Sequence, residues 1–197
     1  MLAHYMDDEE YTNEIINGDI HTANQKAAGL ESRDQAKTFI YALIYGAGDA
    51  KLGSVVKGSR EDGKRLRQHF FDSNPSFKAL RDKVSRASKK GYLKGLDGRK
   101  IFIRSEHAAL NSLLQGGGAV IMKKGLALFD SLIKLNTFDA KFVANIHDEW
   151  QMEVREDLSD HIGTLAVDCI KTAGNYYNLR CPMDGEYKVG RDWSETH

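Results

Sequence analysis

The stretch RDQAKTFIYALIYGAG places two cations and two phenols at four-residue intervals: Arg33, Lys37, Tyr41 and Tyr45. Four residues turn an α-helix by about 400°, so these side chains are expected to share one slowly wrapping helix face. Arg33 and Lys37 fall in the first turns, where free backbone N–H groups and the helix dipole favour an anion. A polyphosphate would neutralise both cations, and the phenols would offer a flat surface to a sugar and base. The alternative is a solvated basic edge followed by two half-buried tyrosines.

A second candidate site is the tripeptide His147-Asp148-Glu149, which lies between two apolar segments. Adjacent carboxylates repel one another and are costly to desolvate, so a site that holds them usually contains a cation. Mg²⁺ prefers oxygen ligands, and a protein often supplies only one or two carboxylates to it. Two such metals can activate an attacking hydroxyl and steady a leaving phosphate. A solvated hairpin turn is the alternative interpretation.

The elements that must position these residues are helices early in the chain and strands late in it. Ser32 is a good N-cap, and Gln35 completes a capping-box pattern for the helix that carries the cations, which should end at Gly46 or Gly48. The pattern predicts further helices over 9–17, 59–73, 75–90, 107–134 and 157–176. Glycines 116–118 either break the long helix or permit close approach of a backbone or ligand.

Two hairpins complete the predicted α+β pattern. Asp97-Gly98 is a strong two-residue turn signal, and the strand-like IFI follows it. The segment FVANIHDEWQMEV predicts two short strands around His147-Asp148-Glu149.

The length, cysteine content and charge distribution of the chain also limit the possible kinds of protein. The 197 residues suit one sizeable domain or two small lobes, and no apolar run approaches the roughly 20 residues of a membrane span. Two cysteines without metal-type spacing favour a reduced, intracellular setting. The net charge is zero, but a basic region over 78–104 lies between acidic ends. That region is either a contact for a polyanion or a solvated face.

Together the two motifs resemble those of family A DNA polymerases. The pattern R-x3-K-x3-Y-x3-YG is similar to motif B, the nucleotide-binding helix of the fingers, and IHDEWQ is similar to motif C, the palm hairpin with a metal-binding aspartate. GDIHTANQ, GLDGRKIFIRSEHAALNSLLQ and VGRDWSETH agree with the same family. The resemblance covers essentially the whole chain, and the wording around motif B is nearest to replicative polymerases of short-tailed bacteriophages.

The resemblance implies a role for each matching residue in binding the incoming nucleotide. Arg33 and Lys37 would hold the triphosphate with help from His21, and Lys37 would also be a proton donor to pyrophosphate. Tyr41 would pack against the sugar, and Tyr45 with Gly46 would close over the nascent base pair or template base.

The resemblance also implies contacts with DNA and metal. Asp148 would bind the metals of a two-Mg²⁺ site with help from Glu149, while His147 would lie near the primer terminus. Primer–template contacts, partly through the minor groove, would come from Arg99, His107, Asn111 and Gln115.

The implied fold is a helical fingers subdomain with part of the antiparallel palm of a right-hand polymerase. The expected division is a palm-edge helix and lead-in over 1–29, fingers over 30–90 and a palm portion with the motif C hairpin over 91–197. Primer–template DNA and a deoxynucleoside triphosphate (dNTP) would be the partners, in the cytoplasm of a bacterial or phage-infected cell. No membrane partner is expected.

The same resemblance places a second metal-binding aspartate, in motif A, a handful of residues before Met1. We therefore expect this polypeptide alone not to extend primers, and expect an N-terminal polymerase segment to supply motif A and the thumb. A split gene, a truncated reading frame and a decayed relic all fit. Two other readings remain: a non-catalytic module that binds nucleic acid or nucleotide, and a relative of single-subunit RNA polymerases.

Overall fold

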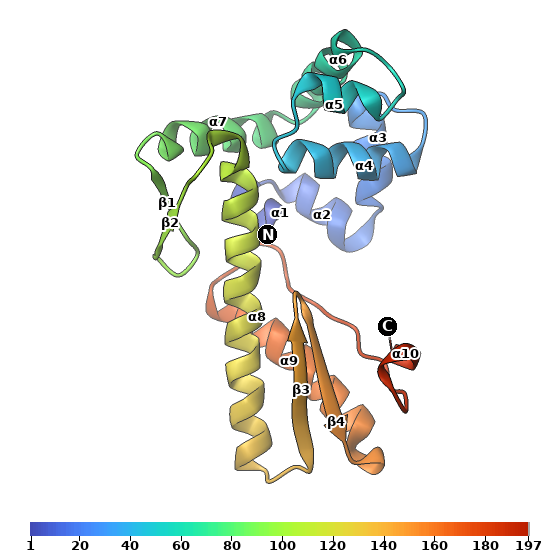
Figure 1. The fold of residues 1–197 in the computed structure, drawn as a ribbon, viewed down its shortest axis with the longest axis vertical. Coiled ribbons are helices and arrows are strands. Elements are labelled where there is room, and N and C mark those ends of the chain that lie inside the picture. The colour runs from blue at the N-terminus through green and yellow to red at the C-terminus, as the bar shows by residue number, and fades with distance from the viewer. Residues whose placement is uncertain (197) are drawn as a thin grey trace. The chain divides into compact units, whose positions relative to one another are not determined.

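The computed structural model describes residues 1–196, which form helices and two small antiparallel sheets (Figure 1). Two compact units are present: Met1–Gln115, and a second unit that begins at Gly116. The predicted α+β class is confirmed. The division into 1–29, 30–90 and 91–197 concerns subdomain roles and stays a prediction; residue 197 lies outside the described residues.

The first unit is mainly helical. Its elements are α1 (Leu2–Met6), α2 (Glu9–Asn17), α3 (Ile20–Ala28), α4 (Arg33–Ile44), α5 (Asp49–Ser54), α6 (Arg60–Ser73), α7 (Pro75–Ser88), strands β1 (Tyr92–Lys94) and β2 (Lys100–Phe102), and the 3₁₀ turn η1 (Glu106–Ala108). Helices α2, α4, α6 and α7 and the β1–β2 hairpin were predicted; α1, α3 and α5 were not. Helices α1 and α5 have only five and six residues, and α3 begins directly after Asn17-Gly18-Asp19.

An aromatic cluster forms the core of the first unit. Phe39, Phe70 and Phe77 are fully buried, and Phe70 lies edge-on to both others, with ring centroids 5.7 Å from Phe39 and 5.3 Å from Phe77. Since one ring comes from each of α4, α6 and α7, the cluster fixes α4 against two neighbouring helices.

Helix α4 begins as predicted, with one change in its capping. The Oγ atom of Ser32 accepts a hydrogen bond from the backbone N–H of Gln35 at 3.2 Å. The Oε1 atom of Gln35 accepts from the backbone N–H of Glu31 at 3.1 Å, one residue before the position that a capping box would use. The helix ends before Gly46, which has a φ of 79°.

Helix α8 (Ala109–Leu135) begins at the end of the first unit and continues into the second. It runs unbroken through Gly116, Gly117 and Gly118, so the alternative of a break between two helices is wrong. A 27-residue helix tolerates three glycines here despite the roughly 1 kcal/mol that each costs relative to alanine.

The second unit holds the predicted late hairpin. Strands β3 (Ala140–Ile146) and β4 (Glu149–Val154) pair antiparallel, followed by the 3₁₀ turn η2 (Glu156–Leu158), α9 (Ser159–Tyr176) and α10 (Trp193–Thr196). Phe129 and Ile133 of α8 form a core with Ile162 and Cys169 of α9. Trp150 packs on that core with its ring 5.7 Å from Phe129, so the hairpin is anchored by β4.

No helix in residues 1–196 has the length and apolar character that a membrane crossing requires.

Candidate functional site

The cationic and phenolic side chains of α4 lie on its exposed face. Arg33 and Lys37 are exposed, and Tyr41 and Tyr45 retain 50% and 57% of their accessible surface. The opposite face buries other residues of the helix: Ala36, Phe39, Ile40 and Leu43. The prediction that the four side chains share one face of a helix is confirmed, while their role in binding a polyphosphate, a sugar and a base stays a prediction. The tyrosines are half exposed and lie outside the buried core of the first unit.

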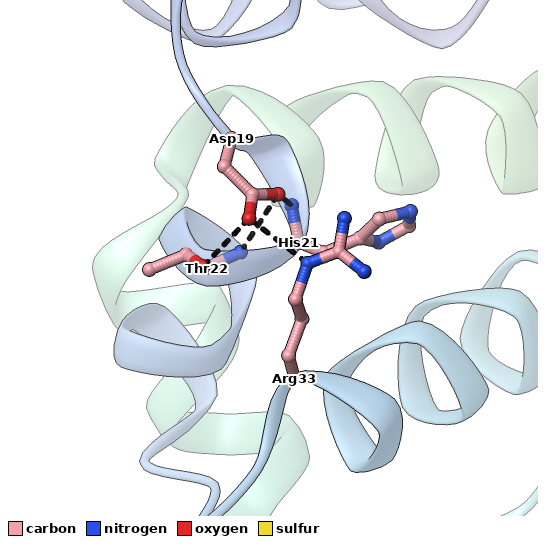
Figure 2. Close-up of polar contacts among 4 residues, drawn as sticks. All are labelled: Asp19, His21, Thr22 and Arg33. Atoms are coloured by element: carbon pink, nitrogen blue, oxygen red, sulfur yellow. Dashed lines mark hydrogen bonds and ion pairs between the residues drawn. The ribbon is translucent and has the colours of Figure 1, made fainter.

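Arg33 is held by a carboxylate that the sequence analysis did not assign to the site. Its Nε atom lies 2.9 Å from Oδ2 of Asp19, the residue that caps the N-terminus of α3 (Figure 2). The same oxygen accepts from the Oγ1 hydroxyl of Thr22 at 2.9 Å. Oδ1 accepts from the backbone N–H groups of His21 and Thr22 at 3.0 and 3.4 Å. One carboxylate thus connects the starts of α3 and α4.

These contacts change the acid–base properties of both partners. The hydrogen bond from Arg33, followed by that from Thr22, holds the pKa of Asp19 well below its usual range. The hydrogen bond and charge of Asp19 raise the pKa of Arg33. The pair is therefore fully ionised at neutral pH.

His21 has an imidazole nitrogen with no protein partner in the structure. Its Nδ1 atom is buried and makes no hydrogen bond within residues 1–196. A buried polar atom is normally satisfied, so this atom marks a position where a ligand or water would be favoured. His21, Arg33 and Asp19 lie together in Figure 2, which confirms that the first unit brings the starts of two helices into one polar cluster.

The far end of α4 meets residues that the sequence analysis assigned to DNA. The Nε2 amide of Gln115 donates a hydrogen bond to the hydroxyl of Tyr45 at 3.4 Å. Gly46 lies so close to η1 that a Cβ atom there would be 2.0 Å from the carbonyl oxygen of His107. The Oδ1 atom of Asn111 is buried without a hydrogen-bond partner among the described residues. His107 and Gln115 therefore neighbour the phenolic end of the stripe, and Asn111 lies one helical turn before Gln115.

Arg99 occupies a different part of the first unit, in the loop of the β1–β2 hairpin. Its guanidinium pairs with Asp97, whose pKa is lowered chiefly by that hydrogen bond. Lys100 of the next strand lies over the ring of Tyr92, 4.7 Å from its centroid. The structure thus gives Arg99 a local carboxylate partner, and its predicted contact with DNA is not tested by this geometry.

The predicted acidic turn is the two-residue loop of the β3–β4 hairpin, in the second unit. Ile146 pairs with Glu149, which leaves His147 and Asp148 as the loop residues. His147 has a φ of 55°, the positive φ that the favoured two-residue hairpin turns need at their first loop position and that histidine adopts more often than most residues other than glycine. Asp148 is exposed at the tip of the loop.

The acidic turn borders a pocket of the second unit. Asp148, Glu149 and Trp150 line a cavity of about 500 Å³ whose walls also include apolar residues of α8 and α9. Glu149 accepts a short hydrogen bond from the side-chain amide of Gln151, which orients its carboxylate. The Nε1 atom of Trp150 is buried without a hydrogen-bond partner in the described part of the chain.

The donors at this turn fit a hard cation only in part. Carboxylate oxygens are the ligands that Mg²⁺ prefers, and Asp148 is exposed and accessible. Within residues 1–196, however, no group of three or more His, Cys, Asp or Glu side chains is placed to hold a metal ion. Asp148 and Glu149 could therefore supply part of a coordination shell, with substrate oxygens and water supplying the rest.

Asp19 is the member of this polar cluster that the sequence analysis did not assign to the site. The signal was present: Asp19 followed by Ile20 and then His21-Thr22 is a good N-cap, and a helix predicted there would have placed His21 in its first turn. Its pairing with Arg33, 14 residues later, depends on how α3 packs on α4 and has no local signal.

Both the sequence and the structure of this chain are similar to those of known proteins. The family described as DNA polymerase family A matches residues 1–195. The chain is 40% identical to the DNA-directed DNA polymerase of Enterobacteria phage T3 and 39% identical to that of Escherichia phage T7, in both cases over all of this chain and 31% of the relative. It thus spans about a third of the length of these relatives.

A solved structure agrees with the sequence matches. The polymerase domain of Pol1 from M. smegmatis, in complex with DNA primer-template and dNTP, is 26% identical and superposes with a TM-score of 0.82. The match covers 93% of this chain and 36% of that one.

Proposed function

This chain belongs to DNA polymerase family A, and we propose that it supplies the fingers and part of the palm of a DNA-directed DNA polymerase. In that reaction the primer 3′-hydroxyl attacks the α-phosphorus of a dNTP. The new P–O bond extends the primer, the bond to the β-phosphate breaks, and pyrophosphate leaves. The fit of the chain to polymerases from two phages, and to a domain solved with primer-template and dNTP, supports this assignment.

We propose that the first unit binds the nucleotide along α4. Arg33 and Lys37 would hold the phosphates from exposed positions in the first turns of the helix, where its dipole adds to their charge. His21 would add its buried, unpartnered imidazole nitrogen. Lys37, an ammonium on a flexible stem, would also give a proton to the leaving pyrophosphate.

The phenolic end of the stripe would meet the sugar and base. Tyr41 is half exposed and lies one turn beyond Lys37, at a suitable distance along the helix for a ribose next to the phosphates. Tyr45 and Gly46 would close over the nascent base pair. Tyr45 accepts a hydrogen bond from Gln115, and Gly46 lies against the backbone of His107. These contacts support a role for the C-terminal end of α4 in holding primer–template.

We assign the remaining DNA contacts to the residues that the family resemblance implies. Asn111 has a buried amide oxygen with no hydrogen-bond partner in residues 1–196, and Gln115 one turn later is exposed. Side chains of this type suit the minor-groove acceptors and donors that base pairs present. Arg99 would contact the backbone of the duplex, and His147 would lie at the primer terminus.

Asp148 would be the metal-binding carboxylate, with Glu149 assisting it. When bound, Mg²⁺ would lower the pKa of the attacking hydroxyl and offset charge on the phosphates. Since the chain carries only part of a coordination shell and spans about a third of its relatives, we propose that full activity also needs a carboxylate and a thumb from a polymerase segment outside these 197 residues. The phage relatives favour a cytoplasmic site of action in a bacterial or infected cell.

The exposed stripe of α4 is the observation that carries the proposal, and dNTP binding tests it. Lys37→Ala removes one of the two cations, so binding of a dNTP–Mg²⁺ complex by the chain should weaken by about tenfold, the effect of one charge-assisted hydrogen bond. Lys64→Ala is the matched control, because Lys64 is an exposed lysine in the middle of α6. Equal binding by wild type and both variants would overturn the assignment of the stripe.

Asp148 separates a polymerase from a non-catalytic binding module. In the chain complemented by an upstream polymerase segment, Asp148→Asn should abolish primer extension and leave primer–template binding within about twofold, since no phosphate or base contact is assigned to it. Asp139→Asn, an exposed aspartate at the other end of the same hairpin, should extend primers normally. Undiminished extension by the Asp148 variant would refute the metal role. A preference for ribonucleotides would favour the RNA polymerase reading.

A further inference from the structure

The carboxylate of Asp19 contacts both helices whose first turns carry the phosphate-binding residues. Resting on the function proposed above, we infer that Asp19 is a positioning residue for nucleotide binding: it fixes the guanidinium of Arg33 through Nε and the start of α3, which carries His21, through the backbone. Asp19 itself would not touch the nucleotide.

The N–H donors of Arg33 are numerous enough to bind Asp19 and a phosphate at the same time. A guanidinium has five N–H donors in a planar fork, and the contact with Asp19 uses the one on Nε. In Figure 2 the dashed line from Asp19 to Arg33 ends on Nε, and no dashed line reaches either terminal nitrogen. The terminal nitrogens are the pair of donors that binds two oxygens of one phosphate. Asp19 therefore orients the fork without occupying the end that a phosphate would use.

Asp19 is itself saturated by donors. Its two oxygens accept from four groups: Arg33 Nε, Thr22 Oγ1 and the backbone N–H groups of His21 and Thr22. The charge of Asp19 is thus offset by Arg33 and by the positive end of α3. This reduces the repulsion that a free carboxylate would exert on a triphosphate.

A role in positioning explains the pair better than a role in stability. Arg33 and Asp19 keep 54% and 43% of their side-chain surface exposed, and ion pairs of that kind add little to folding. An exposed arginine without an anchor samples many rotamers, and binding must then order it. The anchor removes part of that entropy before the nucleotide arrives.

The test needs a variant that keeps the cap and loses the anchor. Serine is also a good N-cap, but it carries no charge and is one atom shorter toward Arg33, so Asp19→Ser removes the ion pair while it preserves α3. Loss of one ordered side chain should weaken dNTP binding by about 3- to 10-fold. Asp19→Asn, which keeps the size and the capping ability, is the second variant in case the first does not fold.

Controls distinguish positioning from a merely structural effect. Asp8→Ser changes the N-cap of α2, whose carboxylate accepts from the Tyr11 N–H and the Ser76 hydroxyl and pairs with no arginine among the described residues, and should leave dNTP affinity unchanged. In an Arg33→Ala background, Asp19→Ser should have no further effect, since the group that it positions is gone. The loss of affinity caused by Asp19→Ser should also be smaller for a deoxynucleoside monophosphate, which lacks the β- and γ-phosphates.

Each outcome has a distinct meaning. Unchanged or tighter dNTP binding by both Asp19 variants would overturn the inference, as would an undiminished effect in the Arg33→Ala background. If Arg33→Ala and Lys37→Ala themselves bind dNTP normally, the proposed function fails instead. A loss in the Arg33 and Lys37 variants with no loss in the Asp19 variants would leave the proposed function standing and reject the positioning role alone.

Discussion

The side-chain amide of Gln115 donates a hydrogen bond to the hydroxyl of Tyr45 at 3.4 Å, although the two residues are 70 positions apart in the chain. Tyr45 caps the C-terminus of α4, and Gln115 lies two turns into α8. The distance is long and both side chains are exposed, so the bond contributes little to stability. Its interest is that it joins a residue assigned to the nucleotide with one assigned to DNA.

Truncation of Gln115 should therefore affect DNA more than folding. Gln115→Ala should change the free energy of unfolding by less than about 0.5 kcal/mol, as exposed substitutions usually do. Primer–template affinity, measured by fluorescence anisotropy at fixed salt, should fall by about 2- to 10-fold from loss of one hydrogen bond to a base edge. Gln68→Ala, which removes an exposed glutamine bonded to Asp72 on α6, should bind DNA as the wild type does. Parallel losses in both variants would argue against a specific contact.

The glycines after α4 give a matched pair for stability. Gly46 has a φ of 79°, and a Cβ there would lie 2.0 Å from the backbone oxygen of His107, so Gly46→Ala should destabilise the chain by about 1–3 kcal/mol. Gly48 has an ordinary φ of −75° and no heavy atom within 4 Å of the corresponding position. Alanine at position 48 would reduce the entropy of the unfolded chain, which stabilises, but it is a weaker N-cap than glycine, which destabilises. Since these effects nearly cancel, the free energy of unfolding of Gly48→Ala should lie within about 0.5 kcal/mol of the wild-type value. Urea denaturation of both variants measures the difference. Similar midpoints would show that η1 moves aside easily.

The sequence contained enough local information for most elements near the site. The four-residue spacing predicted the exposed face of α4, and Ser32 predicted its start, because periodicity and capping act within one or two turns. The hairpin around His147-Asp148 followed from two apolar strand segments of matched length. These features depend on neighbours in the sequence, and all of them were found.

What the sequence could not provide depends on packing between elements. Asp19 pairs with Arg33 only because α3 lies beside α4, and Gly46 approaches His107 only because η1 returns to the end of α4. Helix α5 was missed because it has six residues and no side-chain N-cap. It is stabilised by contact with α6, where a Cβ on Gly63 would lie 1.9 Å from the carbonyl oxygen of Asp49.

The Asp19–Arg33 pair predicts a specific pH dependence. Hydrogen bonds from Arg33 and Thr22 depress the pKa of Asp19 in the folded chain, so its stabilising contribution, which is small because the pair is exposed, is present above the pKa of an unfolded aspartate, about 3.9, and is lost as the pH falls from there toward the folded value. The difference in unfolding free energy between wild type and Asp19→Asn should be constant from about pH 5 to 8 and shrink below about pH 4. Denaturant titrations at several pH values measure it. A difference that grew on acidification would contradict the ion pair.

The unbroken course of α8 leaves close approach of a backbone or a ligand as the remaining interpretation of its central glycines. At Gly118 a Cβ would meet no heavy atom within 4 Å, so nothing in the described structure requires glycine there. Gly118→Ala should stabilise the free chain by about 1 kcal/mol through helix propensity alone. We expect the same variant to bind primer–template more weakly, because the added methyl group would occupy space that the duplex backbone uses. Ala119→Gly, at the exposed neighbouring position, should destabilise the chain by a similar amount and leave DNA affinity unchanged. Thermal unfolding and anisotropy on both variants separate the two effects, and a stabilised Gly118 variant with full DNA affinity would show that no ligand approaches the helix at this point.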